Sequence, residues 1–374
     1  MSGGTERVTA AFALHAARQG HDITLVTTRS KSNRIDVNSR NYLSRSDVNV
    51  VETIEPSWEE SAEEKHYLLY KNLLEREYTN GSGIVWDSTN QGYAYLLTKK
   101  YPKMKILHTR QGMVNFPDFK YILAVKYSRV IGVSLVHAKY LAHTLNRKVK
   151  CVHNGIELPP WGDNKNGNND YNKNNNKNEK KYENNDNGKT KEENYLLSLN
   201  RISREKGIHH AIDVAIETRN SIKIVGDDTH VADLSYVKDV IKRCKKSRGY
   251  AQYYGLVDNS IKEQLLKGCK AVIGCPEKYW IEAFGLYAVE ANAYGKPVLA
   301  IRNGGLNDII ENGVNGFLAD SLDELKGYVT EIETCSPEAC RRRVEEMFSS
   351  KVMTNNYLAI FEKVLLDDDP QFRW

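Results

Sequence analysis

PEKYWIEAFGLYAVEANAYGKPVLA, residues 276–300, places one carboxylate, Glu282, before a predicted helix and a second, Glu290, inside it. Gly285 allows a tight turn and a close backbone approach before the helix begins near Leu286. The first N–H groups of a helix have no intrahelical partner and readily bind an anion such as a diphosphate. Carboxylates beside such a site accept hydrogen bonds from neutral hydroxyls. The stretch therefore suits a sugar nucleotide, although two glutamates at this spacing also fit a helix-start charge and a residue at the edge of the core.

Short apolar runs alternate with amphipathic helical stretches on both sides of this segment. Such alternation is typical of α/β proteins with parallel sheets. A helix is expected over residues 7–19 and a packing helix over residues 351–366. The expected buried strands are residues 22–28, 83–87, 105–109, 195–200, 221–227, 271–275 and 297–301.

A run of Asn, Lys, Asp, Glu and Gly over residues 163–194 divides the chain, because it cannot bury enough apolar surface to fold. The 374 residues also suit two domains better than one. We predict a Rossmann-like acceptor-side domain at 1–160, a disordered linker insertion at 161–194, a Rossmann-like nucleotide-sugar donor domain at 195–350, and a packing helix with a tail at 351–374.

Charge and composition narrow the class of protein. The chain has no apolar run long enough to span a bilayer and no basic or apolar leader before Val8, so a cytoplasmic location is expected. Its net charge is +5, and between Lys99 and Lys150 the only acid is Asp118. This basic surface could meet phosphates or the inner face of an anionic membrane, or could be an ordinary solvated face. The six scattered cysteines are expected to be reduced thiols.

The segment at residues 276–300 resembles the donor-site signature of family 4, or group 1, of the GT-B glycosyltransferases. That signature has two glutamates separated by seven residues, an F-G pair between them, and a continuation into A-x-x-x-G-K-P-V. By this resemblance Glu282 contacts the transferred sugar and Glu290 the ribose hydroxyls, while Leu286 and Tyr287 offer backbone N–H groups. The matching residues are Glu282, Phe284, Gly285, Glu290, Gly295, Lys296, Pro297 and Val298.

Further segments are similar to the same family in the same order. In SLNRISREKGIHHAI, residues 198–212, Arg201 and Lys206 follow a predicted strand, and their cations would neutralise the departing diphosphate. In RNGGLNDIIENGVNGFL, residues 302–318, Gly304 and Gly305 permit close approach of the ligand, and Asp308 takes a position often held by Glu.

The N-terminal half resembles the family as well. GGTERVTAAFALHAARQGHDITLVTT, residues 3–28, looks like its first glycine loop, helix and second strand, with Gly3 and Gly4 near the donor or acceptor. ILHTR, residues 106–110, looks like the strand end that offers a histidine, His108, to the donor sugar, although a lone histidine is often structural. The family's first strand has no counterpart before Gly3, so we expect exposed strand edges, with the true start upstream or the protein compromised.

The resemblance implies transfer of a sugar from a UDP- or GDP-linked donor to a carbohydrate or lipid-linked acceptor, with retention of configuration. No Asp-x-Asp site suits a metal, since residues 367–369 are expected in a frayed C-terminal tail, so the prediction includes neither a metal nor a cofactor. The alternatives are a catalytically impaired nucleotide-sugar-binding relative, a sugar-nucleotide 2-epimerase on the same fold, and a nucleic-acid-binding protein. The last lacks a stacking motif or recognisable module, so nucleic acid is not expected as a partner.

Overall fold

The structure is a computed structural model. Its described part is built from parallel strands joined by helices. It describes residues 4–27, 48–52, 62–77, 83–89, 94, 96–97, 101, 104–113, 128–161, 194–229, 231 and 233–366. Every pairing between its strands is parallel. The predicted α/β class is therefore confirmed, while most of the predicted linker and the predicted Gly3 position lie outside the described residues.

The N-terminal half carries its described strands in two sheets. Its elements are α1 (Gly4–Arg18), β1 (Ile23–Thr27), β2 (Val48–Glu52), α3 (Ala62–Glu77), β3 (Ile84–Asp87), β4 (Lys105–His108), β5 (Arg129–Gly132), α5 (Leu135–Leu145) and β6 (Lys150–Cys151). β1 pairs with β2, and β3, β4, β5 and β6 form a second sheet in that order. Ile23 of β1 and Ile84 of β3 nevertheless pack on the same apolar cluster. The described strands of this half thus form two sheets where a Rossmann-like domain would have one. Both sheets pack on the same apolar core.

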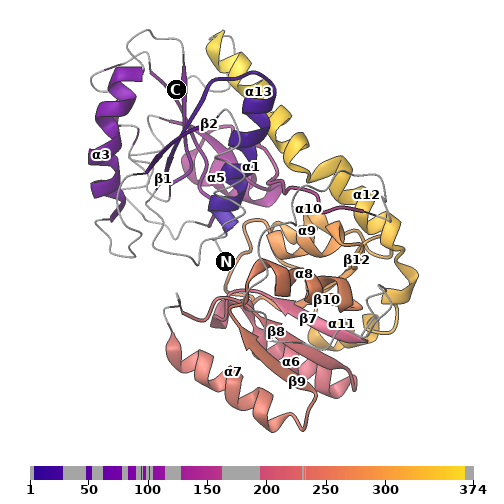
Figure 1. Cartoon of the computed structure of the whole chain (residues 1–374). Helices are drawn as coiled ribbons and strands as arrows, with labels where there is room; N and C mark the ends of the chain where they lie inside the picture. Colours follow the sequence, from indigo (N-terminus) through magenta and orange to yellow (C-terminus); the bar gives the residue numbers. More distant parts are fainter. Residues whose placement is uncertain are drawn as a thin grey trace, which may run out of the picture.

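The C-terminal half is built on one six-stranded sheet, shown in the lower part of Figure 1. Its strands are β7 (Tyr195–Leu199), β8 (Ser221–Val225), β9 (Ala251–Gly255), β10 (Ala271–Gly274), β11 (Val298–Ile301) and β12 (Gly316–Ala319). Their order in space is β12-β11-β10-β7-β8-β9. The chain therefore starts at the centre, builds one side, returns and builds the other, which makes this sheet doubly wound as predicted.

Helices cover both faces of the six-stranded sheet because its strands are apolar on both sides. Leu196 and Leu197 are neighbours in β7, yet they belong to different apolar clusters, as successive strand side chains point to opposite faces. One cluster holds side chains of α6 (Ile208–Glu217), α7 (Leu234–Lys246) and α11 (Leu322–Tyr328). The other holds those of α8 (Asn259–Gly268), α9 (Leu286–Ala293) and α12 (Pro337–Met347).

The last helix, α13 (Ser350–Leu365), leaves the C-terminal half and packs on the N-terminal half beside α1. Figure 1 shows it in yellow along the edge of the upper lobe. Its buried Tyr357 contacts the rings of Phe12 and Trp86, with centroids 5.7 Å and 4.6 Å away. The predicted packing helix is confirmed, and its partner is the half of the protein that is distant in sequence.

The structure also bears on whether a helix could cross a membrane and on the state of the cysteine thiols. None of the described helices combines the length and apolarity required to cross a bilayer. All six cysteines are free, and five of them are buried. Burial raises the pKa of the Cys151 thiol to about 12, with Asp308 adding to the shift, so this thiol stays protonated at neutral pH.

Candidate active site

The centre of the six-stranded sheet is where its connections change direction. β7 and β10 are neighbours there, with Leu196 opposite Ala271. Parallel neighbours end at the same edge, so the loops that follow β7 and β10 lie together, and such switch points form the ligand crevices of doubly wound sheets. The loop after β7 carries Arg201 and the short 3₁₀ helix η3 (Arg204–Lys206), and the loop after β10 carries Glu282.

Lys206 and Glu282 meet at this edge. The Lys206 Nζ donates a hydrogen bond to Glu282 Oε2, across 76 residues of sequence. Both side chains are largely buried, with exposed fractions of 15% and 13%. Arg201, by contrast, is 44% exposed and pairs with Glu205 at 3.0 Å. Of the two predicted cations, Lys206 is therefore the one that directly contacts the predicted sugar-binding glutamate.

The start of α9 lies a few residues beyond Glu282. Gly285 is the N-cap of this helix and has a φ of +105°, a conformation that L side chains rarely adopt. The N–H of Ala288 bonds to Gly285 O at 3.0 Å, so the preceding N–H groups of Leu286 and Tyr287 have no intrahelical partner. The side chain of Tyr287 is buried in the core, and only its backbone faces the anion-binding end of the helix.

Asn303 and the following glycines hold the backbone of Glu282. Asn303 Oδ1 accepts a hydrogen bond from Glu282 N at 2.7 Å, and Glu282 O accepts one from Gly305 N at 2.7 Å. A Cβ atom on Gly304, whose φ is +49°, would lie 2.0 Å from Glu282 O. The backbone of Gly304 and Gly305 lies directly against the backbone of Glu282. The contact that these two predicted glycines make in the structure is therefore one that holds Glu282 in position.

Replacing Gly304 with alanine is expected to displace Glu282 and lower turnover strongly, by about tenfold or more, since a small misplacement of a reacting group has a large effect. The matched control is Gly313→Ala, because Gly313 also has a positive φ, +78°, but nothing within 4 Å of the added Cβ. Thermal unfolding and initial rates of both variants would be compared. Equal rates would show that the close approach at Gly304 is unimportant.

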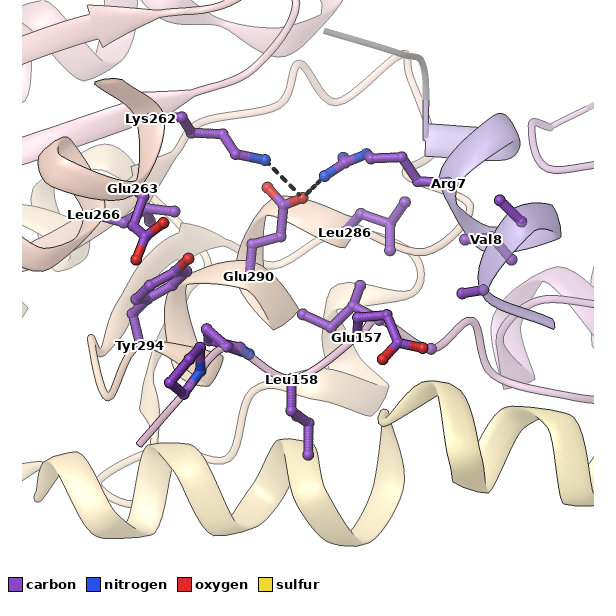
Figure 2. A pocket seen from close by; sticks show the side chains of 16 residues that line it. Arg7, Val8, Glu157, Leu158, Lys262, Glu263, Leu266, Leu286, Glu290 and Tyr294 are labelled. Carbon is purple, nitrogen blue, oxygen red and sulfur yellow. Dashed lines mark hydrogen bonds and ion pairs between the residues drawn. The ribbon is translucent and has the colours of Figure 1, made fainter. Parts of the chain in front are cut away.

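Glu290 lies on α9 and points into an interdomain pocket of about 380 Å³. Figure 2 shows Arg7 of α1 and Lys262 of α8 approaching its carboxylate from opposite sides. Glu290 Oε1 accepts hydrogen bonds from Arg7 Nη1 and from Lys262 Nζ, the latter at 3.4 Å. Glu290 is only 7% exposed, so these two cations compensate the burial of its charge. Sequence reasoning missed both of them.

Arg7 lies three residues after Gly4 of the predicted glycine loop. This nearness to a predicted ligand-binding loop is the sequence feature that could have indicated a role for Arg7 in the site. Gly4 is the first residue of α1, the helix whose Arg7 contacts Glu290. Lys262 gave no comparable signal, because it is 28 residues from Glu290 and resembles any solvated helix lysine.

His108 ends β4 and is fully buried, so its imidazole has no exposed surface that could contact a ligand in this conformation. Burial lowers its pKa, Asp87 opposes this shift, and Arg110 adds to it. Nearby His137 is also buried, and burial together with Arg110 and His108 lowers its pKa to about 4. Both imidazoles are therefore neutral at pH 7. The structure does not bring His108 to the surface of the site.

Asp308 links the two halves of the protein. Its Oδ2 accepts a hydrogen bond from Leu135 N at the start of α5, at 2.6 Å, and lies 2.9 Å from His153 Nε2. The His153 ring in turn lies near Phe284, with centroids 6.1 Å apart. Asp308 takes the position where a Glu was often expected. Its shorter carboxylate is held there by a hydrogen bond from the start of α5 in the opposite half.

Comparisons with known proteins agree with this architecture. Residues 179–347 match the family described as glycosyl transferases, group 1. An uncharacterized 41.2 kDa protein in the cps region of Klebsiella pneumoniae is 32% identical over 48% of this chain and 49% of its own length. An alpha-1,3/1,6-mannosyltransferase of Candida glabrata is 27% identical over 44% and 45%. The chain therefore spans about half the length of the curated relatives that it matches.

Solved structures resemble the whole chain at low sequence identity. HepE from Anabaena in complex with UDP and glucose superposes with a TM-score of 0.68, 15% identity and 96% coverage of both chains. Sucrose-phosphate synthase from Thermosynechococcus elongatus has a TM-score of 0.70 and 16% identity, with 98% of this chain and 95% of that chain covered. At such identity these structures show the shared fold. Residues 179–347 thus match the group 1 glycosyl transferases, and the chain as a whole has the GT-B fold.

Proposed function

We propose that this protein transfers a sugar from a nucleoside diphosphate sugar to an acceptor hydroxyl. The observation that carries the proposal is the contact between Lys206 and Glu282 at the switch point of the sheet, a few residues before the N-terminus of α9. A cation and free helix N–H groups suit a diphosphate, and a carboxylate suits the hydroxyls of a sugar. HepE, a protein of the same fold, has been solved with UDP and glucose.

In this proposal Lys206, Arg201 and the start of α9 bind the diphosphate, with Gly285, Leu286 and Tyr287 supplying backbone. The bond between the anomeric carbon and the diphosphate oxygen breaks, and the acceptor oxygen forms the new bond to that carbon. The acceptor proton leaves with the diphosphate. Negative charge develops on the leaving group, where Lys206 stabilises it. Retention of configuration is proposed from the family resemblance.

Glu290 would accept hydrogen bonds from the ribose hydroxyls, and Glu282 from the transferred sugar. Phe284 is buried and supports the turn between these glutamates, while Gly304 and Gly305 support Glu282. We assign the acceptor side to the N-terminal half, where His108 would require a local movement to reach the sugar. The acceptor is a carbohydrate or a lipid-linked carbohydrate, and the basic N-terminal half favours contact with an anionic membrane in the cytoplasm.

The proposal is tested by calorimetric titration of UDP, GDP, ADP and their common sugar conjugates, followed by product analysis with candidate acceptors. Saturable binding of one nucleotide and a new glycosidic product would support it. Rates unaffected by added Mg²⁺ or Mn²⁺ would support transfer without a metal on the diphosphate. Binding without a product would favour the impaired relative, and an altered donor sugar without an acceptor would favour the 2-epimerase. Failure of every nucleotide to bind would refute the donor site.

Glu290→Gln is expected to weaken nucleotide binding by about 1–3 kcal/mol, or roughly five- to 150-fold in Kd, through lost ribose hydrogen bonds. The control is Glu263→Gln, because Glu263 lines the same pocket but pairs with Lys267 at 2.6 Å. Calorimetry with the nucleotide selected by the screen measures both variants. The ribose assignment would be wrong if Glu290→Gln and Glu263→Gln bound nucleotide equally well.

A further inference from the structure

Two adjacent histidines and a glutamate converge beside the switch point. His209 and His210 lie in the first turn of α6, and Glu277 lies three residues beyond β10. Glu277 Oε1 is 3.4 Å from His209 Nε2 and 3.3 Å from His210 Nε2. The three ligand atoms all lie within 4.8 Å of one another. All three residues are partly buried and remain accessible from solvent.

These distances differ from those of a direct ion pair. A charged imidazolium that donates to a carboxylate is expected at about 2.7–2.9 Å. Ligands about 2.0–2.2 Å from a tetrahedral metal ion are separated from each other by roughly 3.3–3.6 Å, which follows from the tetrahedral angle. Both measured N···O distances fall in the second range.

The groups around the cluster hold it in place. Tyr236 OH lies 2.8 Å from His209 Nδ1, which orients that ring and leaves its Nε2 directed at Glu277. Metal-bound histidines usually have such a partner on the second ring nitrogen. The backbone of Glu277 is fixed as well, because its N–H donates to Glu205 O at 2.9 Å and its carbonyl accepts from Trp280 N at 3.0 Å.

We propose that His209, His210 and Glu277 form a binding site for a divalent transition-metal ion, with zinc the ion that two imidazoles and one carboxylate favour. Water completes the coordination on the accessible side. The site joins the start of α6, which is separated from Lys206 by Gly207 alone, to the loop that leads to Glu282. Its role is to hold these two segments together, and the metal takes no part in sugar transfer.

The test is a calorimetric titration of Zn²⁺ into chelator-stripped, nucleotide-free protein, with Co²⁺ absorption as the report on coordination geometry. We expect one site per chain and the intense visible bands of four-coordinate Co²⁺. Glu277→Gln and His210→Gln should each weaken Zn²⁺ binding by at least about tenfold. The control is His143→Gln on the exposed face of α5, which should leave the affinity unchanged. Circular dichroism of the metal-free variants checks that they fold.

Absence of stoichiometric Zn²⁺ binding would overturn the proposal, and so would full affinity in both cluster variants. Amide exchange gives a second readout, because residues 276–282 should exchange more slowly with Zn²⁺ than without it. Equal exchange would refute the proposed link between the two segments. None of these measurements depends on a donor sugar or an acceptor, so they can fail or succeed independently of the proposed transferase activity.

Discussion

Lys206→Ala lowers kcat/KM for sugar transfer by about 10²–10³-fold, the loss expected when one preorganised group that stabilises developing charge is removed. Lys206 is 15% exposed, so water screens its charge little, and in the proposed donor complex that charge would act strongly on the diphosphate. Removal also leaves the Glu282 carboxylate without the cation that it contacts in the structure. Initial rates with the donor identified by nucleotide screening measure the effect.

The matched control for this variant is Arg204→Ala. Arg204 lies on the same short 3₁₀ helix, but its side chain is more than half exposed and it pairs with Asp233 at 3.7 Å. We expect less than about a threefold change in rate there, because exposed ion pairs contribute little. Similar losses in both variants would show that the positive charge of the segment matters and that the Lys206–Glu282 contact does not. Thermal unfolding of each variant separates loss of folding from loss of function.

Tyr357→Ala is expected to lower the free energy of unfolding by about 3–5 kcal/mol, as for other large aromatic residues truncated in a core. The Tyr357 side chain is fully buried among Phe12, Trp86 and Phe361, and its hydroxyl lies 3.2 Å from Thr109 Oγ1. Truncation therefore removes ring contacts, opens a cavity and leaves a buried hydroxyl without one of its partners. Chemical denaturation followed by tryptophan fluorescence measures the change, because Trp86 lies against this ring.

The control is Asn356→Ala, one residue away on the exposed face of α13, where we expect a change within about 0.5 kcal/mol. Since α13 joins the two halves, the unfolding of the N-terminal half should be affected most by Tyr357→Ala. A loss below about 1 kcal/mol would mean that α13 contributes little to the N-terminal core, in contradiction to its packing on α1.

The sequence alone determined most of the C-terminal half. The predicted strands at 195–200, 221–227, 271–275 and 297–301 are all present within a residue or two. Three of them, β7, β10 and β11, are runs buried on both faces, and β8 also buries most of its residues. The order of motifs along the chain also pointed to the group 1 family. Glu282, Gly285 and Glu290 could be predicted since the turn, the helix start and both carboxylates lie within one local segment.

The N-terminal half was less predictable from local pattern. β2 and β5 were not among the expected strands, and the described strands form two sheets where one was expected. Hydrophobic periodicity identifies a strand, but it contains no information about which strand will be its neighbour. The sequence placed His108 at the end of a strand, where β4 ends, but its complete burial follows from the packing around it.

Only the tertiary structure decided which charges meet. Arg7 reaches Glu290 across 283 residues, and Asp308 reaches Leu135 across 173. Glu277 of the loop after β10 meets His209 and His210 of α6, 68 and 67 residues earlier in the chain. These contacts depend on the strand order and on how the two halves pack. Neither can be predicted from a short stretch of sequence. The sequence thus specified the local structure around Glu282 and Glu290 and the resemblance to the group 1 family, because both are properties of contiguous residues. The partners of its buried charges were set by contacts between distant segments, which exist only after the chain has folded.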